Sequence, residues 1–260
     1  MEQYFFKPTH FLRVFWCVAT IGIIGGIGYI THIYINLPDV RSLKTINPPS
    51  TALIELRYAE AQKSGKSPRR LQRWIPFDLI SDHLKLAVLM AEKAYPLHGC
   101  IEASELPKPT ETSWGNKLMI GGNDLITQHL AQNLYFPTSD NSFFDFREFM
   151  MTQRLESELS NCRIFEIYLN VIEWGDGIWG IEAASRAYFK IPAISLNQEQ
   201  AALLAATLAN PRLHNPANPS KRLLRRKQFI LERMNEIESH ASTPAAISLG
   251  IATEPAFYSK

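Results

Sequence analysis

The stretch RIFEIYLNVIEWGDGIWGIEAASRAYF, residues 163–189, decides the fold of this chain. Apolar side chains recur at helical spacing on both sides of its glycine-rich centre, which predicts one helix over residues 162–173 and a second over residues 178–189. Further helices are predicted over residues 51–62, 81–94, 124–135, 142–159, 198–208 and 219–238. No segment alternates between apolar and polar residues as a strand does, so the predicted fold class is mostly α.

Capping residues support three of these helix starts. Ser81 and Asn123 are plausible N-caps, and Asn197 with Gln200 fits a capping box. The basic run KRLLRRK, residues 221–227, is interpreted as a solvated helix face. The side chains expected to pack inward from that helix are Leu223, Leu224, Phe229 and Ile230. Contact of the basic face with acidic lipid or nucleic acid is the alternative.

The composition is that of a globular protein with a sizeable core. Of the 260 residues, 46% are hydrophobic and 20% are charged, which excludes a disordered chain. The net charge of +2 gives no case for an acidic tail or for nucleic acid as a partner. The cysteines Cys17, Cys100 and Cys162 are too few for a disulfide scaffold and lack the spacing of a zinc site. Whether Cys100 and Cys162 pair is left open by the sequence.

An uncharged segment near the N-terminus is long enough to cross a membrane. Residues 14–37 contain no charged side chain, and about 24 residues of helix span about 36 Å. The apolar run continues into THIYINLP without a small-residue cleavage site, so an uncleaved anchor is favoured over a signal peptide. Basic residues flank the segment almost evenly. The short tail before it and the long domain after it predict that the tail lies inside the cell and the domain outside.

Residues 163–189 resemble the fourth motif of the bacterial peptidoglycan glycosyltransferases. The pattern of that motif is close to RILExYLNxxExGxGxxGxExAAxxYF, and nearly every fixed position matches. The segment LLAATLANPRLHNPANPS, residues 203–220, resembles the Ala-rich motif that follows it in the family. The segment LPDVRSLKTINPPSTALI, residues 37–54, resembles the connector of the monofunctional biosynthetic transglycosylases. The resemblance covers residues 37–235 together with the anchor.

The resemblance implies a helical, partly lysozyme-like glycosyltransferase domain that a single-pass helix holds on the outer, periplasmic face of the inner (plasma) membrane. The acceptor sugar's 4-hydroxyl would attack the anomeric carbon of the donor strand, and undecaprenyl pyrophosphate would leave. The implied partners are lipid II, the nascent glycan strand, the membrane and other proteins of cell-wall synthesis, with no nucleic acid. The expected parts are a cytoplasmic tail, a transmembrane helix, a connector, the glycosyltransferase domain and a C-terminal tail, over residues 1–13, 14–37, 38–76, 77–240 and 241–260 respectively.

The family's first motif supplies the general base. A carboxylate in a partly dry cleft can remove the proton of the attacking hydroxyl. The family pattern is close to EDxxFxxHxG, and here the text is AEKAYPLHG, residues 91–99. Counting from the upstream helix places Glu92 on the base position, whereas counting back from His98 places Ala91 there. Because one residue turns a helix by about 100°, the two alternatives point in different directions, and Glu92 is preferred. His98 is a candidate for substrate binding.

The second motif, close to GGSTITQQLAKN in the family, is here GGNDLITQHLAQN, residues 121–133. Asp124 and Leu125 stand where a Ser-Thr pair belongs. His129 replaces the second Gln, and Gln132 replaces a Lys that contacts substrate. The candidates for substrate binding in this motif are Asp124, Thr127, Gln128, His129, Gln132 and Asn133.

The third motif is close to RKxxE. Counting back from the fourth motif, Phe144 and Asp145 occupy the Arg and Lys positions, and Glu148 keeps the Glu as a catalytic candidate. Glu156, two turns later, and Arg147, beside Glu148, are candidates for substrate binding.

The substitutions remove three family cations from the region that meets the pyrophosphate. A charge-assisted hydrogen bond contributes about 1.5–3 kcal/mol, so losing two would slow the reaction by about two to four decades. Two replacements are conceivable. One is a cation in a new position, and the residues available for it are Lys93, Arg147, Arg154 and Arg163. The other is a divalent metal such as Mg²⁺, held by Asp124, Asp145 and Glu148.

The sequence therefore leaves three hypotheses. The first is a working glycosyltransferase that polymerises lipid II in an altered cleft. The second is a catalytically impaired paralogue that binds lipid II or acts as a membrane-anchored scaffold for cell-wall synthesis. The third, a lysozyme-like hydrolase that pairs Glu92 with a second carboxylate, is disfavoured by the strong fourth motif.

Overall fold

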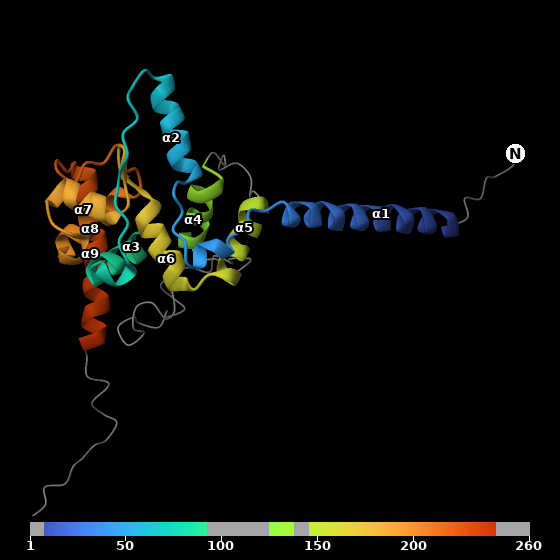
Figure 1. Ribbon diagram of the computed structural model, residues 1–260. Helices are drawn as coiled ribbons and strands as arrows, with labels where there is room; N and C mark the ends of the chain where they lie inside the picture. The colour runs from blue at the N-terminus through green and yellow to red at the C-terminus, as the bar shows by residue number, and fades with distance from the viewer. Residues whose placement is uncertain (1–7, 93–124, 138–145, 243–260) are drawn as a thin grey trace, which may run out of the picture.

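The computed structural model describes residues 8–92, 125–137 and 146–242, and this part of the chain is mostly helical, as predicted (Figure 1). Its elements in chain order are α1 (Pro8–Ile35), η1 (Arg41–Lys44), α2 (Ala52–Lys63), β1 (Leu71–Gln72), η2 (Phe77–Leu79), α3 (Asp82–Glu92), α4 (Leu125–Tyr135), α5 (Phe146–Glu158), α6 (Asn161–Val171), β2 (Glu173–Gly175), β3 (Ile178–Trp179), α7 (Ile181–Phe189), η3 (Ala193–Ser195), α8 (Gln198–Thr207) and α9 (Lys221–Ser242).

The N-terminal helix α1 extends away from the folded domain (Figure 1). Its apolar part, Phe15–Ile35, has 21 residues and a mean hydropathy of 1.6, so by length and composition it is able to span a membrane. Large apolar side chains such as Ile24 and Tyr29 are exposed on it. The helix begins before the predicted segment 14–37 and ends two residues earlier than that segment.

Helix α5 carries contacts that hold the end of α1 to the domain. Arg154 Nη1 donates to the carbonyl oxygens of Leu37 at 3.2 Å and Tyr34 at 3.4 Å. The Arg154 guanidinium carbon also lies 5.4 Å from the centroid of the Tyr34 ring. Glu158 accepts a hydrogen bond from Lys44 Nζ at 2.9 Å, and this bond is the main cause that lowers the pKa of Glu158. The segment between α1 and α2 is therefore fixed to α5.

The glycine-rich centre of residues 163–189 folds as a short hairpin, which the sequence did not predict. Strand β3 lies in the middle of a three-stranded sheet, parallel to β1 and antiparallel to β2. The two predicted helices were accordingly too long: α6 ends at Val171 and α7 begins at Ile181. Strands of two or three residues are too short to show an alternating pattern in the sequence.

Two glycines of this hairpin have positive φ angles that other residues rarely adopt. Gly177 has φ +69°, and a Cβ there would lie 2.6 Å from the carbonyl oxygen of Arg69. Gly180 has φ +76°, and a Cβ there would lie 2.6 Å from the carbonyl oxygen of Asn170. The hairpin can therefore press closely against α6 and the segment before β1 only because glycine stands at both positions.

The side chain of Asn170 joins α6 to the segment that enters the domain. Its Oδ1 accepts from Ile75 N at 2.9 Å, and its Nδ2 donates to Ile75 O at 3.0 Å and to Glu166 O at 2.8 Å. Asn170 is fully buried and Ile75 is nearly so. Since buried backbone groups without partners are costly, this amide fixes the path of the chain before α3.

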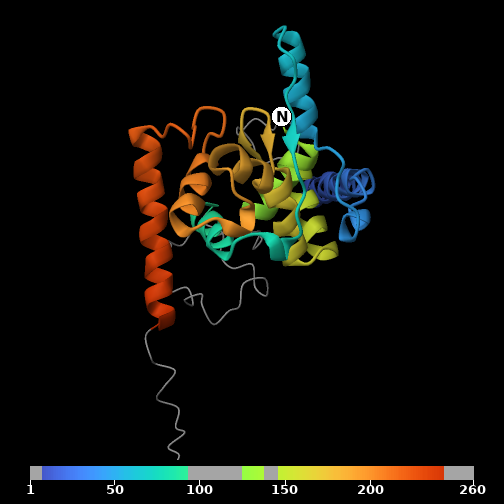
Figure 2. The same ribbon diagram turned by 60° about the vertical axis from the view of Figure 1, so that its left-hand side comes forward.

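The core lies around α6. Helix α4 packs against α5, α6 and α2, while α3 packs against α8 and α9. Figure 1 and Figure 2 agree that α9 covers the side of the domain far from α1. The largest fully buried side chains include Trp174, Trp179 and Phe165. This packing brings the C-terminal end of α3 near α4.

The predicted helix starts are partly confirmed. The capping box of Asn197 and Gln200 is present at α8. Ser81 stands at the predicted N-cap position, since it directly precedes α3 and its carbonyl oxygen accepts from Lys85 N at 3.1 Å. Its hydroxyl donates to the carbonyl oxygen of Leu196 at 2.8 Å. The predicted cap Asn123 lies outside the described residues.

Lys221, Arg222 and Arg225 of the basic run on α9 are exposed as predicted, whereas Arg226 and Lys227 are half-buried. Only two of the four side chains predicted to pack inward are buried. Leu223 and Ile230 are buried in the core, whereas Leu224 is 43% exposed and Phe229 is 46% exposed. The Arg233 guanidinium carbon lies 4.6 Å from the centroid of the Phe229 ring, and this contact shields part of the ring from solvent.

Replacing Asn170 with Ala is expected to lower the free energy of unfolding by about 2–4 kcal/mol, because both backbone groups of Ile75 lose their buried partner. Urea denaturation followed by circular dichroism measures the change. The matched control is Asn210→Ala at an exposed position, which should change the stability by less than about 0.5 kcal/mol. Equal stability of the two variants would show that Asn170 does not fix this segment.

Candidate active site

Glu92 is the last residue of α3, and its carboxylate points to α4. The Glu92 Oε2 atom lies 2.8 Å from Nδ1 of His129, and the Glu92 side chain is only 10% exposed. The contact is an ion pair when the imidazole is protonated and a hydrogen bond when it is neutral. The alternative base position, Ala91, packs against the hydrophobic core. Of the two alternatives, Glu92 is thus the one whose side chain meets a residue of the second motif.

Glu148 lies on α5 and is buried, with 6% of the residue exposed. Its Oε1 atom accepts hydrogen bonds from Gln128 Nε2 at 2.7 Å and from Gln132 Nε2 at 2.9 Å. The two glutamines are one turn apart on α4, so their amides reach the same oxygen. A buried carboxylate needs such donors, because an ionised group without partners is strongly disfavoured away from water.

One turn of α4 therefore serves two carboxylates from different helices. His129 reaches Glu92 at the end of α3, while Gln128 and Gln132 reach Glu148 on α5. The sequence analysis named all five residues as candidates but did not predict that they form two groups joined by α4. The four-residue spacing of Gln128 and Gln132 does predict that both amides lie on one face of the helix.

Two other candidates of the second motif, Thr127 and Asn133, contact their own helix or the interior of the domain. Thr127 is 1% exposed and lies in the interior of the domain. The Asn133 side chain donates to the carbonyl oxygen of His129 at 2.7 Å, one turn earlier on the same helix. The structure does not bring either side chain to the two carboxylates by a direct hydrogen bond.

The candidates on α5 lie on different sides of that helix. Arg147 is exposed, and its guanidinium carbon lies 5.7 Å from the centroid of the Phe136 ring, just after α4. Glu156 is half-buried two turns beyond Glu148. His98 and Asp124 lie outside the described residues, as do Lys93, Phe144 and Asp145.

Two of the conceivable replacement cations instead hold the end of α1 and the segment that follows it. Arg154 holds the end of the anchor, as described above. Arg163 donates to the Leu43 carbonyl oxygen at 2.8 Å and to Asn47 Oδ1 at 2.7 Å, and it pairs with Glu166 at 3.0 Å. The proposal that either arginine replaces a lost phosphate contact is therefore not favoured by its position.

A metal site is not formed by the described residues alone. Within residues 8–92, 125–137 and 146–242, no three His, Cys, Asp or Glu side chains come together as metal ligands would. Glu148 is the only described member of the acidic set considered for a divalent cation, and one of its oxygens already accepts two amide donors.

The comparisons with known proteins agree on one family. The family model described as Transglycosylase matches residues 60–235. The chain is 38% identical over 196 residues to a protein of Nitrosomonas eutropha, an alignment that covers 74% of this chain and 79% of the relative. It is 37% identical over 193 residues to a protein of Methylobacillus flagellatus, with 74% and 84% covered. Both relatives are named biosynthetic peptidoglycan transglycosylase.

Replacing Gln128 with Met is expected to lower the free energy of unfolding by about 1–3 kcal/mol, since the buried Glu148 carboxylate loses one of the two donors that it has among the described residues. Chemical denaturation at neutral pH measures this loss. Gln228→Met is the matched control, because Gln228 donates to Glu232 with the same side-chain pairing on an exposed face of α9. It should cost less than about 0.5 kcal/mol. A loss at Gln128 no larger than at Gln228 would contradict the account of Glu148.

Proposed function

The chain belongs to the transglycosylase family and is a peptidoglycan glycosyltransferase, and we propose that it polymerises lipid II with Glu92 as the general base. The observation that carries the role of Glu92 is its contact with His129 on α4. The same helix is hydrogen-bonded to Glu148 through Gln128. The alternative of a non-catalytic paralogue has no support in the comparisons, since both relatives described above carry the name of the enzyme.

The proposed step is a single displacement. The Glu92 carboxylate takes the proton of the acceptor's 4-hydroxyl, and the freed oxygen attacks the anomeric carbon of the donor strand. The bond from that carbon to the pyrophosphate breaks, and undecaprenyl pyrophosphate leaves with the electron pair. The low exposure of Glu92 favours proton transfer, and the contact with His129 orients its carboxylate. The new proton on Glu92 then passes to water.

Glu148 is proposed to act through α4, whose residues Gln128 and Gln132 are hydrogen-bonded to its carboxylate. Its carboxylate fixes Gln128 and Gln132, and this fixes the register of α4 at the turn that carries His129. The distance from Glu92 to His129 therefore depends on a carboxylate that lies on a different helix.

Charge on the leaving pyrophosphate also needs a partner. We place Arg147 in this role, since it is exposed on α5 next to Glu148 and its guanidinium offers several donors in one plane. Substrate contacts by the other candidates of the second and third motifs remain part of the same proposal. A divalent cation such as Mg²⁺ is a separate proposal that depends on Asp124 and Asp145, and no step is derived through it.

The orientation in the membrane is proposed from two observations. Helix α1 is a candidate single-pass anchor, and α5 ties the domain to it. Cys162 is disulfide-bonded, and disulfides persist in oxidising compartments outside the cytoplasm. We therefore place the domain on the periplasmic side of the inner membrane, where lipid II and the nascent strand are its partners. Association with other proteins of cell-wall synthesis belongs to the same proposal.

Glu92→Gln is expected to reduce the polymerisation of lipid II at least 100-fold, because an amide cannot accept the hydroxyl proton. Electrophoresis of the glycan strands made by the full-length protein measures this loss. Binding of lipid II should change less than threefold, which separates loss of the base from loss of the fold. Glu232→Gln on the exposed face of α9 is the control and should keep full activity. Unchanged polymerisation by Glu92→Gln would remove Glu92 from the role of base.

Arg147→Ala is expected to slow polymerisation at least tenfold, since a charge-assisted contact contributes about 1.5–3 kcal/mol. Arg222→Ala, which removes an exposed arginine from α9, is the control. Repeating both assays with a chelator, and then with added Mg²⁺, tests the metal proposal. Turnover that stops with chelator and returns with Mg²⁺ supports a bound metal. A rate that neither addition changes rejects the metal proposal. Full activity of Arg147→Ala without metal would contradict the role given to Arg147.

A further inference from the structure

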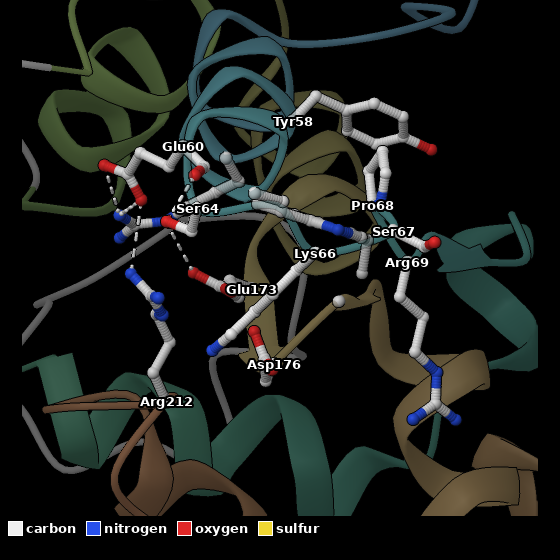
Figure 3. Close-up of a pocket in the computed structure, with 14 residues that line it drawn as sticks. Tyr58, Glu60, Ser64, Lys66, Ser67, Pro68, Arg69, Glu173, Asp176 and Arg212 are labelled. Atoms are coloured by element: carbon white, nitrogen blue, oxygen red, sulfur yellow. Dashed lines mark hydrogen bonds and ion pairs between the residues drawn. The ribbon is translucent and has the colours of Figure 1, made fainter.

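A second polar pocket lies between α2, the segment before β1 and the turn between β2 and β3 (Figure 3). Its volume is about 290 Å³, which is enough for one or two amino-acid residues. It shares no lining residue with the group formed by Glu92, His129 and Glu148. The pocket is therefore separate from the site where the proposed reaction takes place.

One side of the pocket is closed by a charge network. Arg57 donates to Glu60 at 2.9 Å and to Glu173 Oε2 at 3.3 Å, and Arg212 donates to Glu60 at 3.3 Å. The Glu173 side chain is 4% exposed, and its burial raises the pKa of this carboxyl even though Arg57 opposes the change. These charges largely satisfy one another, so they build the wall and leave other groups to meet a ligand.

Three exposed charged side chains remain available in the pocket, namely Lys66, Arg69 and Asp176. Arg69 and Asp176 are exposed, and neither side chain has a hydrogen bond or ion pair with another residue in the part of the chain that the structure describes. Figure 3 shows Lys66 extending toward Glu173 and Asp176, while Arg69 points to the other side. The pocket thus offers a cation and a carboxylate at separate places.

The backbone that carries these two groups is fixed. Leu71 N donates to Gly177 O at 2.8 Å, which ties the segment of Arg69 to the turn of Asp176. Gly177 lies so close to Arg69 that a Cβ would be 2.6 Å from the Arg69 carbonyl oxygen. A rigid wall reduces the ordering cost of binding, which distinguishes this pocket from a mobile surface loop.

We propose that this pocket binds the short peptide branches of the glycan strand, with Arg69 holding a peptide carboxylate and Asp176 holding a peptide ammonium group. A ligand with both charges matches the pocket better than a simple anion, because an anion pairs with Arg69 or Lys66 but leaves Asp176 unused. The proposal rests on the proposed function, since that function brings a peptide-bearing strand to this protein. The pocket would hold the strand while Glu92 acts elsewhere.

The test measures peptide binding to the full-length protein in detergent micelles, without lipid II, by isothermal titration calorimetry. The probe is a short peptide that carries a free carboxylate and one free ammonium group. Two analogues accompany it: one with an amidated carboxylate and one with an acetylated amine. Each analogue is expected to bind at least fivefold more weakly than the intact peptide.

Two variants assign the two contacts. Arg69→Gln should weaken binding of the intact peptide at least fivefold, yet leave the amidated analogue unaffected because its carboxylate contact is already absent. Asp176→Asn should weaken the intact peptide in the same way and leave the acetylated analogue unaffected. Lys63→Gln, at an exposed position on α2 that does not line the pocket, should bind like the wild type. Thermal unfolding verifies that all variants are folded.

The outcomes separate this proposal from the proposed function. Binding that Glu92→Gln retains and Arg69→Gln loses supports the pocket even if the wild type makes no glycan. Absence of peptide binding, or binding that neither pocket variant weakens, overturns the proposal for the pocket. The proposed function is tested separately by the polymerisation assay. Inorganic phosphate that competes as strongly as the peptide would also overturn it, because the pocket would then be an anion site.

Discussion

The hydrogen bonds that join Glu148 to Gln128 and Gln132 are the interaction on which the site depends. They fix α5 to α4 through a carboxylate that is removed from water. Helix α5 also holds the anchor through Arg154, so the same helix connects the membrane segment to the helix that carries His129. A change in the position of α5 would therefore move both the segment that follows α1 and the partner of Glu92.

The altered motifs make chemical sense around this carboxylate. Where the family pattern has a lysine, Gln132 gives a neutral donor that satisfies Glu148 without adding charge. The substitution therefore keeps a hydrogen-bond donor to this carboxylate, worth about 1.5–3 kcal/mol for a bond to a charged group, and removes a positive charge from the site. Arg147 is the exposed cation nearest in sequence to Glu148, which is why the proposed mechanism depends on it.

The sequence predicted the helices well where the apolar pattern was long, as in α6 and α8. It missed the hairpin of β2 and β3, because that turn depends on contacts of Gly177 and Gly180 with distant backbone atoms. It nominated Glu92, His129 and Glu148 from motifs, yet their grouping depends on tertiary packing that no spacing records. The pocket of Arg69 and Asp176 was missed for the same reason, since its walls come from segments about a hundred residues apart.

The most direct test of the account is the product that the unaltered full-length protein makes from lipid II in lipid vesicles. The account predicts glycan strands that lengthen with time, with one undecaprenyl pyrophosphate released for each disaccharide joined. Folded protein that binds lipid II but makes no strand would contradict it. Shortening of added strands would contradict it as well, and would mean that the two carboxylates serve hydrolysis instead of transfer.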